Sequence, residues 1–223
     1  MKRTLALLAL TGALASPTAV VSHPHVWVTG GAHVGLDEEG RLARIHVTWI
    51  YDTFASLYLL NYLKADQDGD QVLSERDKEL ILADQTNWPE DFQGDSYLYV
   101  SGEKRALGRA ENPDTRILES GQVEVTFERA VIEPYRPGSG EPDAIIKIYD
   151  PYFYYAYEVT EAPEIITKSD DHGCSVQHSK PNPEDDEGLA ALQVELSALG
   201  REETPTQQDV GAFFADEIRL TCG

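Results

Sequence analysis

Strand-like and helix-like segments occur in separate runs along this chain, and that order most constrains its fold. Alternating apolar residues typical of strands dominate residues 25–49 and again 95–168, whereas helical spacing is confined to 52–84 and 189–199. A parallel α/β fold needs a helix between successive strands, so this order favours an α+β fold with a mainly antiparallel sheet. We expect the helical segment at 52–84 to be a helix–loop–helix insertion.

The first two strands are expected to form a long hairpin around the turn at Asp37–Gly40. If residue 36 lies opposite residue 41, the register places Asp52 opposite His25 and close enough for the two side chains to share a cation. After Asp52 the spacing of apolar residues becomes helical. One side of this helix carries Phe54, Leu57, Tyr58 and Leu60.

Five further strands and a closing strand complete the expected sheet. They are Tyr97–Val100, Arg116–Leu118, Val123–Phe127, Ala144–Tyr149, Tyr152–Val159 and Asp216–Cys222. Residues 169–188 are expected to form a polar, acidic loop, followed by an amphipathic helix at Leu189–Leu199.

Residues 1–22 have the layout of a secretory signal peptide, with two basic residues, an apolar stretch at Leu5–Ala15 and then small and polar residues. The stretch is shorter than the roughly 20 residues of a membrane-spanning helix. Cleavage after residue 22 would make His23 the first mature residue, and cleavage a few residues earlier fits the same rule. We therefore expect a periplasmic protein without stable membrane insertion, whose residues 23–223 form a single metal-handling domain.

The net charge of the chain restricts the classes of molecule that this protein is expected to bind. The chain has 39 acidic and 18 basic residues, for a formal net charge of −21. Such a surface repels nucleic-acid phosphates and anionic lipid headgroups, so no nucleic-acid partner is expected. It attracts cations, including metal ions.

The chain has two cysteines, Cys174 and Cys222. An even, minimal count in an exported protein predicts a disulfide, because the compartment is oxidising. A thiolate metal site would need more cysteines.

The loop that starts at Asp66 and ends at Asp77 matches the spacing of an EF-hand calcium loop. The expected oxygen ligands are Asp66, Asp68, Asp70, the Val72 carbonyl, Ser74 and Asp77. Two departures reduce the quality of the match. Gln71 replaces the glycine of the sharp turn, and Asp77 is shorter than the usual glutamate. The alternative is an acidic helix–helix turn without an ion.

A second metal site is expected at the start of the mature chain. His23 and His25 supply two imidazoles, and Asp52 adds a carboxylate in the expected register. This ligand set suits zinc, with a fourth ligand from elsewhere or from water. Asp52 alternatively caps the helix that follows it.

The other four histidines have weaker cases. His33 and His46 lie within strand patterns and are interpreted as packed or surface residues. His172 and His178 lie in the acidic loop and are candidates for an accessory zinc site.

Several motifs occur together in an order that resembles a known family. They are His23–Val28, Thr48–Asp52, the acidic loop, Tyr149–Tyr155, and Gly173–Cys174 with Cys222. Together they resemble the ZevA-like family (domain of unknown function 1007), although Trp27 stands where a phenylalanine is expected. The resemblance implies a periplasmic metal-binding partner of a transition-metal permease of the inner membrane, a type of permease linked to nickel, cobalt and zinc.

Three classes of function therefore remain open. The favoured hypothesis is a non-enzymatic periplasmic binding protein for a transition metal, zinc above others, that serves a permease. The alternatives are a zinc- or copper-dependent periplasmic enzyme and a calcium-stabilised interaction module. The sequence lacks a Gly-x-Ser-x-Gly elbow, a His-Glu-x-x-His pair and a phosphate-binding glycine loop, which weakens the enzyme hypothesis.

Overall fold

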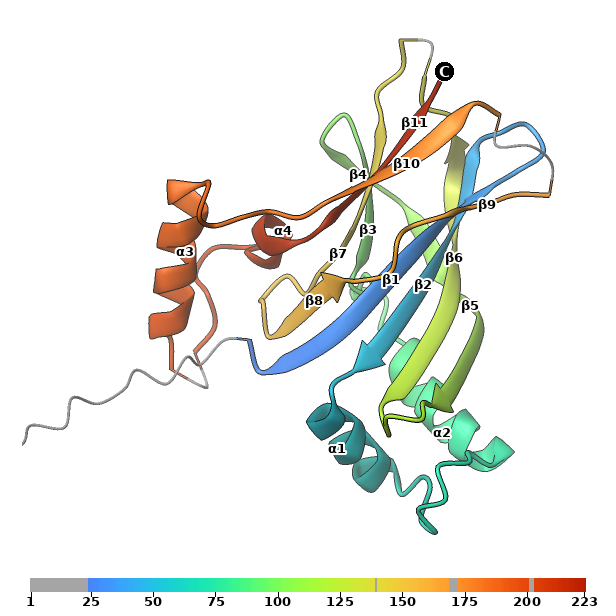
Figure 1. Cartoon of the computed structure of the whole chain (residues 1–223), viewed down its shortest axis with the longest axis vertical. Coiled ribbons are helices and arrows are strands. Elements are labelled where there is room, and N and C mark those ends of the chain that lie inside the picture. Colours follow the sequence, from blue (N-terminus) through green and yellow to red (C-terminus); the bar gives the residue numbers. More distant parts are fainter. Residues whose placement is uncertain (1–23, 139, 169–171, 201–202) are drawn as a thin grey trace, which may run out of the picture.

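The computed structural model describes residues 24–138, 140–168, 172–200 and 203–223. Two sheets dominate this part of the chain, so the fold is α+β, as predicted (Figure 1). The six-stranded sheet contains β1 (Val26–Leu36), β2 (Leu42–Tyr51), β5 (Leu107–Ile117), β6 (Val123–Tyr135), β8 (Tyr155–Val159) and β9 (Ile165–Ile166). The five-stranded sheet contains β3 (Ser96–Val100), β4 (Glu103–Arg105), β7 (Ala144–Ile148), β10 (Cys174–Ser179) and β11 (Glu217–Cys222).

Strand pairing is mainly antiparallel, with two exceptions at β1. In the first sheet the order is β5-β6-β2-β1-β8, and β8 and β9 both run parallel to β1. In the second sheet the order is β10-β11-β7-β3-β4, and its neighbouring strands are antiparallel. The first sheet is therefore mixed, whereas the second is antiparallel.

Four helices lie in the described part of the chain. They are α1 (Thr53–Leu63), α2 (Glu75–Thr86), α3 (Glu187–Ala198) and the short α4 (Gly211–Phe214). Helices α1 and α2 lie together at one end of the six-stranded sheet, whereas α3 projects to one side of the molecule (Figure 1). No helix among the described residues is both long and apolar enough to cross a membrane.

One cluster of buried side chains joins the two sheets. It contains Trp49 and Phe127 from the first sheet, Ile146 and Ile218 from the second, and Ile81 from α2. The alternation of buried and half-buried residues along β2 and β7 is the period of two that a strand with one core face requires.

Several large apolar side chains of α1 are exposed, although their spacing in the sequence is typical of a helix face that packs against a core. Its buried residues are Ser56 and Leu59. Ser56 accepts the Val123 N–H and donates to the Tyr51 carbonyl, which fastens the helix to β2 and β6. The large side chains instead face outward, with exposed fractions of 79% for Phe54, 58% for Leu57, 65% for Tyr58 and 66% for Tyr62.

The predicted hairpin exists, but its register differs from the expected one by two residues. Leu36 pairs with Leu42, so the turn is one residue longer than assumed. A bulge between Gly35 and Leu36 adds the second residue, and Gly35 pairs with Arg44. As a result, Asp52 lies opposite Trp27 rather than His25.

The segment at 169–188 is not simply a loop. Its residues 174–179 form β10, which pairs along its length with the closing strand β11. Alternation is weak in this polar strand because four of its six side chains are exposed. The pattern of apolar residues therefore could not reveal it.

Candidate functional site

His25 stands at the edge of a hollow of about 680 Å³, just before β1 begins. Its backbone N–H donates to the Tyr154 carbonyl (2.8 Å), and its ring lies 4.6 Å, centroid to centroid, from the Tyr154 ring. We call this space the aromatic hollow. Its walls include Phe54, Tyr58, Tyr62, Tyr51, Tyr155 and Asp84.

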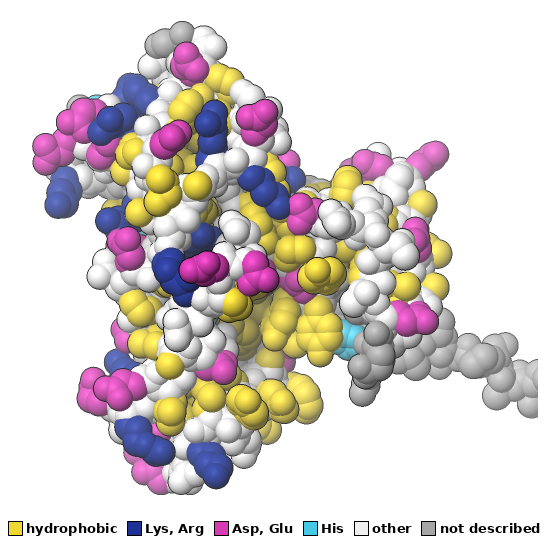
Figure 2. All heavy atoms as spheres, turned by 180° about the vertical axis from the view of Figure 1, so that it is seen from behind, with side chains coloured by type: hydrophobic (Ala, Val, Ile, Leu, Met, Phe, Trp, Pro, Cys, Tyr) yellow, Lys and Arg dark blue, Asp and Glu magenta, His cyan; other side chains and the backbone are white. Residues whose placement is uncertain are grey.

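The aromatic hollow opens on a surface rich in hydrophobic side chains. Figure 2 shows such side chains gathered over the middle and lower part of this face of the molecule. Burial raises the pKa of the Tyr51 phenol well above its usual value and also raises that of Tyr155. Both phenols therefore stay neutral and can donate hydrogen bonds at any ordinary pH.

Asp52 has a structural role at the junction of β2 and α1. Its Oδ1 accepts the Ala55 N–H (2.8 Å), which caps the helix, and its Oδ2 accepts the Trp27 N–H (3.0 Å). The Trp27 carbonyl in turn accepts the Asp52 N–H. The sequence raised this capping role as an alternative, and the shifted register places the carboxylate beside Trp27 instead of directly opposite His25.

His23, the other predicted zinc ligand, lies outside the described residues. The structure does bring a carboxylate that sequence reasoning missed to the hollow at His25, namely Asp84 on α2. Residues 25 and 84 are far apart in the chain and share no motif. Only the packing of α2 beside the end of the hairpin brings them to one hollow.

His33 and His46 face each other as cross-strand partners in the hairpin. His46 Nδ1 lies 3.3 Å from Glu128 Oε1, and His33 Nε2 lies 3.8 Å from Glu161 Oε2. Burial lowers the pKa of His46. The Glu164 N–H donates to His33 Nδ1, so this pair is tied into the sheet rather than into the hollow at His25.

The remaining histidines lie at the two ends of β10. The His178 ring nitrogen Nε2 lies 3.0 Å from Asp216 Oδ2, an oxygen that also accepts the Val159 N–H. The His172 carbonyl accepts a hydrogen bond from Arg136. Five residues separate the two histidines, and four of them lie in extended β10, so the two side chains are on the order of 15 Å apart and cannot hold one ion together.

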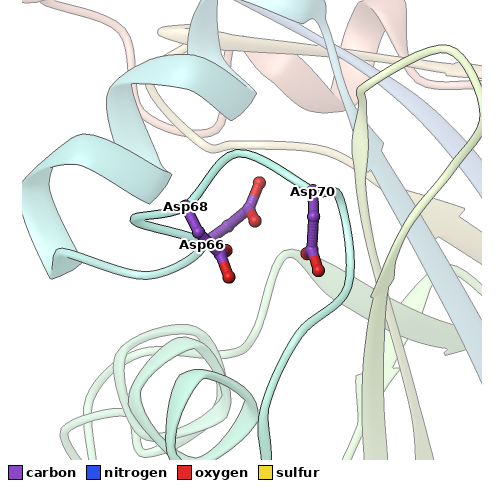
Figure 3. A group of neighbouring side chains, drawn as sticks. All are labelled: Asp66, Asp68 and Asp70. Atoms are coloured by element: carbon purple, nitrogen blue, oxygen red, sulfur yellow. The ribbon is translucent and has the colours of Figure 1, made fainter.

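The loop between α1 and α2 brings three of the predicted calcium ligands together. One ligand atom from each of Asp66, Asp68 and Asp70 lies within 4.8 Å of the other two. The three side chains lie inside the curve of the loop (Figure 3). The Gln71 N–H donates to Asp66 Oδ1 at 3.2 Å. Gln71 has a φ of +64°, the left-handed conformation that a glycine would adopt at lower cost.

The second half of this loop caps the N-terminus of α2. The Ser74 and Asp77 side chains form a reciprocal capping box, and Ser74 Oγ donates to Asp77 Oδ2 at 2.6 Å. Hydrogen bonding from Ser74 lowers the pKa of Asp77. The sequence predicted Ser74 and Asp77 as ligands, and the structure pairs them with each other.

Cys174 and Cys222 form a disulfide, as predicted. They are direct partners in the pairing of β10 with β11, and both are buried at the edge of the core. A buried structural disulfide is typical of proteins that mature in an oxidising compartment outside the cytoplasm.

The α+β fold, the disulfide and the aromatic hollow define a two-sheet protein with a disulfide typical of extracytoplasmic proteins and an aromatic-lined hollow at one end of its hairpin. The chain belongs to the family described as protein of unknown function (DUF1007), which matches residues 7–222. A comparison with curated proteins found no match.

Proposed function

We propose that this protein is a periplasmic binding protein for a transition metal, with zinc as its preferred cargo, and that it serves a metal permease of the inner membrane. It acts by binding and release rather than by catalysis. In this proposal residues 1–22 are a cleaved signal peptide and residues 23–223 are one domain. The single observation that carries the proposal is the position of His25 at the edge of the aromatic hollow, directly after His23 and Pro24 in the sequence.

The chemistry of this site supports an exchangeable metal. His25 supplies an imidazole, and Asp84 supplies a carboxylate to the same hollow. Imidazole and carboxylate ligands suit zinc. His23 would add a second imidazole, and Asp52 remains a candidate ligand, because each of its carboxylate oxygens accepts one N–H and keeps a further lone pair. A site at the edge of a hollow, unlike a closed structural site, can release its ion to a partner.

The partner surface in this proposal is the outward face of α1. Phe54, Leu57 and Tyr58 are exposed beside the hollow that His25 borders. Exposed apolar patches of this kind mark interaction surfaces. A permease that docks here would meet the metal site and the patch at the same time.

The test is calorimetric titration of the mature protein with zinc. His25→Ala should weaken zinc binding about tenfold or more, because one of few ligands is lost. His33→Ala is the matched control: it removes an imidazole from β1, the strand that follows His25, but leaves the hollow intact. Binding of zinc by His25→Ala with the affinity and stoichiometry of the parent protein would refute the site.

We also propose that the loop from Asp66 to Asp77 is an EF-hand-like calcium site with a structural role. The converging aspartates and the conformation of Gln71 support this proposal. Calcium should raise the melting temperature of the parent protein but not that of an Asp68→Asn, Asp70→Asn variant. If calcium leaves the parent unchanged, the loop is an acidic turn that needs no ion.

A further inference from the structure

A second, smaller cavity of about 210 Å³ adjoins the aromatic hollow and shares four of its lining residues, Tyr51, Asp84, Gln85 and Tyr155. We call it the acidic chamber. Six aromatic side chains and three carboxylates line it, and the carboxylates are those of Asp84, Asp95 and Asp150. Within this described lining there is no lysine or arginine. The chamber therefore combines aromatic faces with acidic side chains and no basic one.

Asp95 is the central feature of the acidic chamber. It is only 5% exposed, directly before β3, and its φ is +43°. Its Oδ2 accepts a hydrogen bond from the Tyr157 hydroxyl at 2.9 Å. Its Oδ1 is fully buried and has no hydrogen-bond partner within the part of the chain that the structure describes. Such an atom is costly to bury and invites a donor.

A second polar atom of the chamber wall is in the same condition. Trp49 is 3% exposed, and its indole Nε1 has no acceptor among the described residues. Two residues that line one small cavity thus each carry a buried polar atom that lacks a partner among the described residues. The Asp95 oxygen points to a ligand that carries N–H groups, whereas the Trp49 N–H calls for an acceptor atom and does not select a cation.

The electrostatics of the chamber favour a cation. The Asp150 carboxylate accepts three backbone N–H groups, from Tyr152, Tyr154 and Tyr155. Burial, reinforced by this neighbouring charge, raises the pKa of Asp95 to about 8. A cation bound between the two carboxylates would relieve both effects.

The aromatic walls decide what kind of cation fits. The ring centroids of Trp49 and Trp88 are 6.0 Å apart, and those of Trp49 and Tyr157 are 6.1 Å apart. Aromatic faces attract organic cations but offer no ligand atoms to a metal ion. Arg129 already stacks on Trp88, with its Cζ 5.7 Å from the ring centroid, and is not among the residues that line the chamber.

We propose that the acidic chamber binds the primary ammonium or guanidinium head of a small organic molecule, whose tail lies in the adjoining aromatic hollow. Asp95 Oδ1 accepts an N–H of the head group, and the aromatic rings surround its charge. The two adjoining spaces together have the size and the mostly aromatic lining of a small-molecule site. This binding differs from zinc binding at His25 in its head-group residue, Asp95, although both proposals use Asp84 and the aromatic hollow.

The experiment is calorimetric titration of the whole mature protein at pH 8 with three probes. Phenethylammonium should bind at least tenfold more tightly than phenethyl alcohol, its neutral isostere. Tetramethylammonium, which has the charge but no N–H, should bind at least tenfold more weakly than phenethylammonium. Equal affinity for the charged and neutral probes would overturn the proposal.

Two variants locate the binding. Asp95→Asn should reduce phenethylammonium affinity at least tenfold, and asparagine tolerates the positive φ at this position. Circular dichroism and the melting temperature would show that the variant is folded. Asp91→Asn, an exposed neighbour, removes the same charge outside the chamber and should change nothing. Unchanged affinity in Asp95→Asn would overturn the proposal.

Two further outcomes would also overturn it. In the first, zinc displaces phenethylammonium and zinc binding itself depends on Asp95, which would make the chamber a metal site. In the second, lysine-containing peptides bind and small amines do not, which would make it a protein-docking site. The His25→Ala zinc titration is independent of these measurements, so the two proposals can fail separately.

Discussion

Replacing Asp95 with asparagine should change how the stability of this protein depends on pH. The raised pKa of about 8 in the folded protein compares with an ordinary value of 3.8. Below about pH 4 the carboxyl is protonated in both states, so its full contribution to stability is present. As the pH rises towards 8, the unfolded chain ionises first, and the folded state loses about 1.4 kcal/mol per pH unit relative to it.

The size of this pH effect on the free energy of unfolding can be worked out for a chosen pH range. Between pH 5.5 and 7.5, the free energy of unfolding of the parent protein should fall by about 2.5 kcal/mol relative to that of Asp95→Asn. Other titrating groups contribute equally to both proteins and cancel in this difference. The residue is 5% exposed, so solvent screening does little to reduce the effect.

Urea unfolding of both proteins, followed by circular dichroism at several pH values, measures this difference directly. The stability of the variant relative to the parent should rise as the pH rises. If the two free energies of unfolding run parallel across this window, Asp95 is ionised in the folded protein and the reasoning about its buried environment is wrong.

Three other perturbations have defined outcomes. Reduction of the disulfide between Cys174 and Cys222, which closes a loop with a sequence separation of 48, should lower the free energy of unfolding by about 4 kcal/mol in denaturant titrations. Ser56→Ala should cost about 2 kcal/mol in the same assay, because it leaves the buried Val123 N–H without its acceptor. Gln71→Gly should raise the free energy of unfolding by about 0.5 to 1 kcal/mol, because glycine adopts the φ of +64° without steric cost.

Matched changes test the reasoning behind these numbers. Ser120→Ala removes a hydroxyl from an exposed turn and should be nearly neutral. Gln67→Gly adds a glycine to the same loop at a residue whose φ is not positive, so it should lower stability. Equal effects of the two serine changes, or of the two glycine changes, would contradict the structural explanation. If the free energy of unfolding does not change when reductant is added, the stabilisation expected from the disulfide is wrong.

The sequence predicted those features that local chemistry determines. The hairpin, both N-terminal helices and the disulfide follow from a turn signal, from helical spacing and from an even cysteine count. The register of the hairpin did not follow, because turn length and the bulge at Gly35 depend on tertiary packing. That shift of two residues moved Asp52 from its expected place opposite His25 to one beside Trp27.

Helix α1 shows why burial could not be inferred from apolar spacing alone. Phe54, Leu57 and Tyr58 have the spacing of a core-facing stripe, yet the buried residues of the helix are Ser56 and Leu59. A hydrophobic pattern does not distinguish a face that packs in its own domain from one reserved for a ligand or partner. In this helix the exposed apolar face lies beside His25, as a binding function for this face would require.

The acidic chamber could not be found from sequence for a related reason. Trp49, Asp95 and Asp150 come from separate strands and turns, and no spacing rule connects them. Asp150 resembles an ordinary turn aspartate in sequence, and its three N–H contacts confirm that role. The same contacts place this carboxylate in the chamber, where it adds to burial in raising the pKa of Asp95. Turn formation and cation selection therefore depend on one carboxylate, so loss of Asp150 would disturb both, whereas a change at Asp95 isolates the chemistry of the chamber.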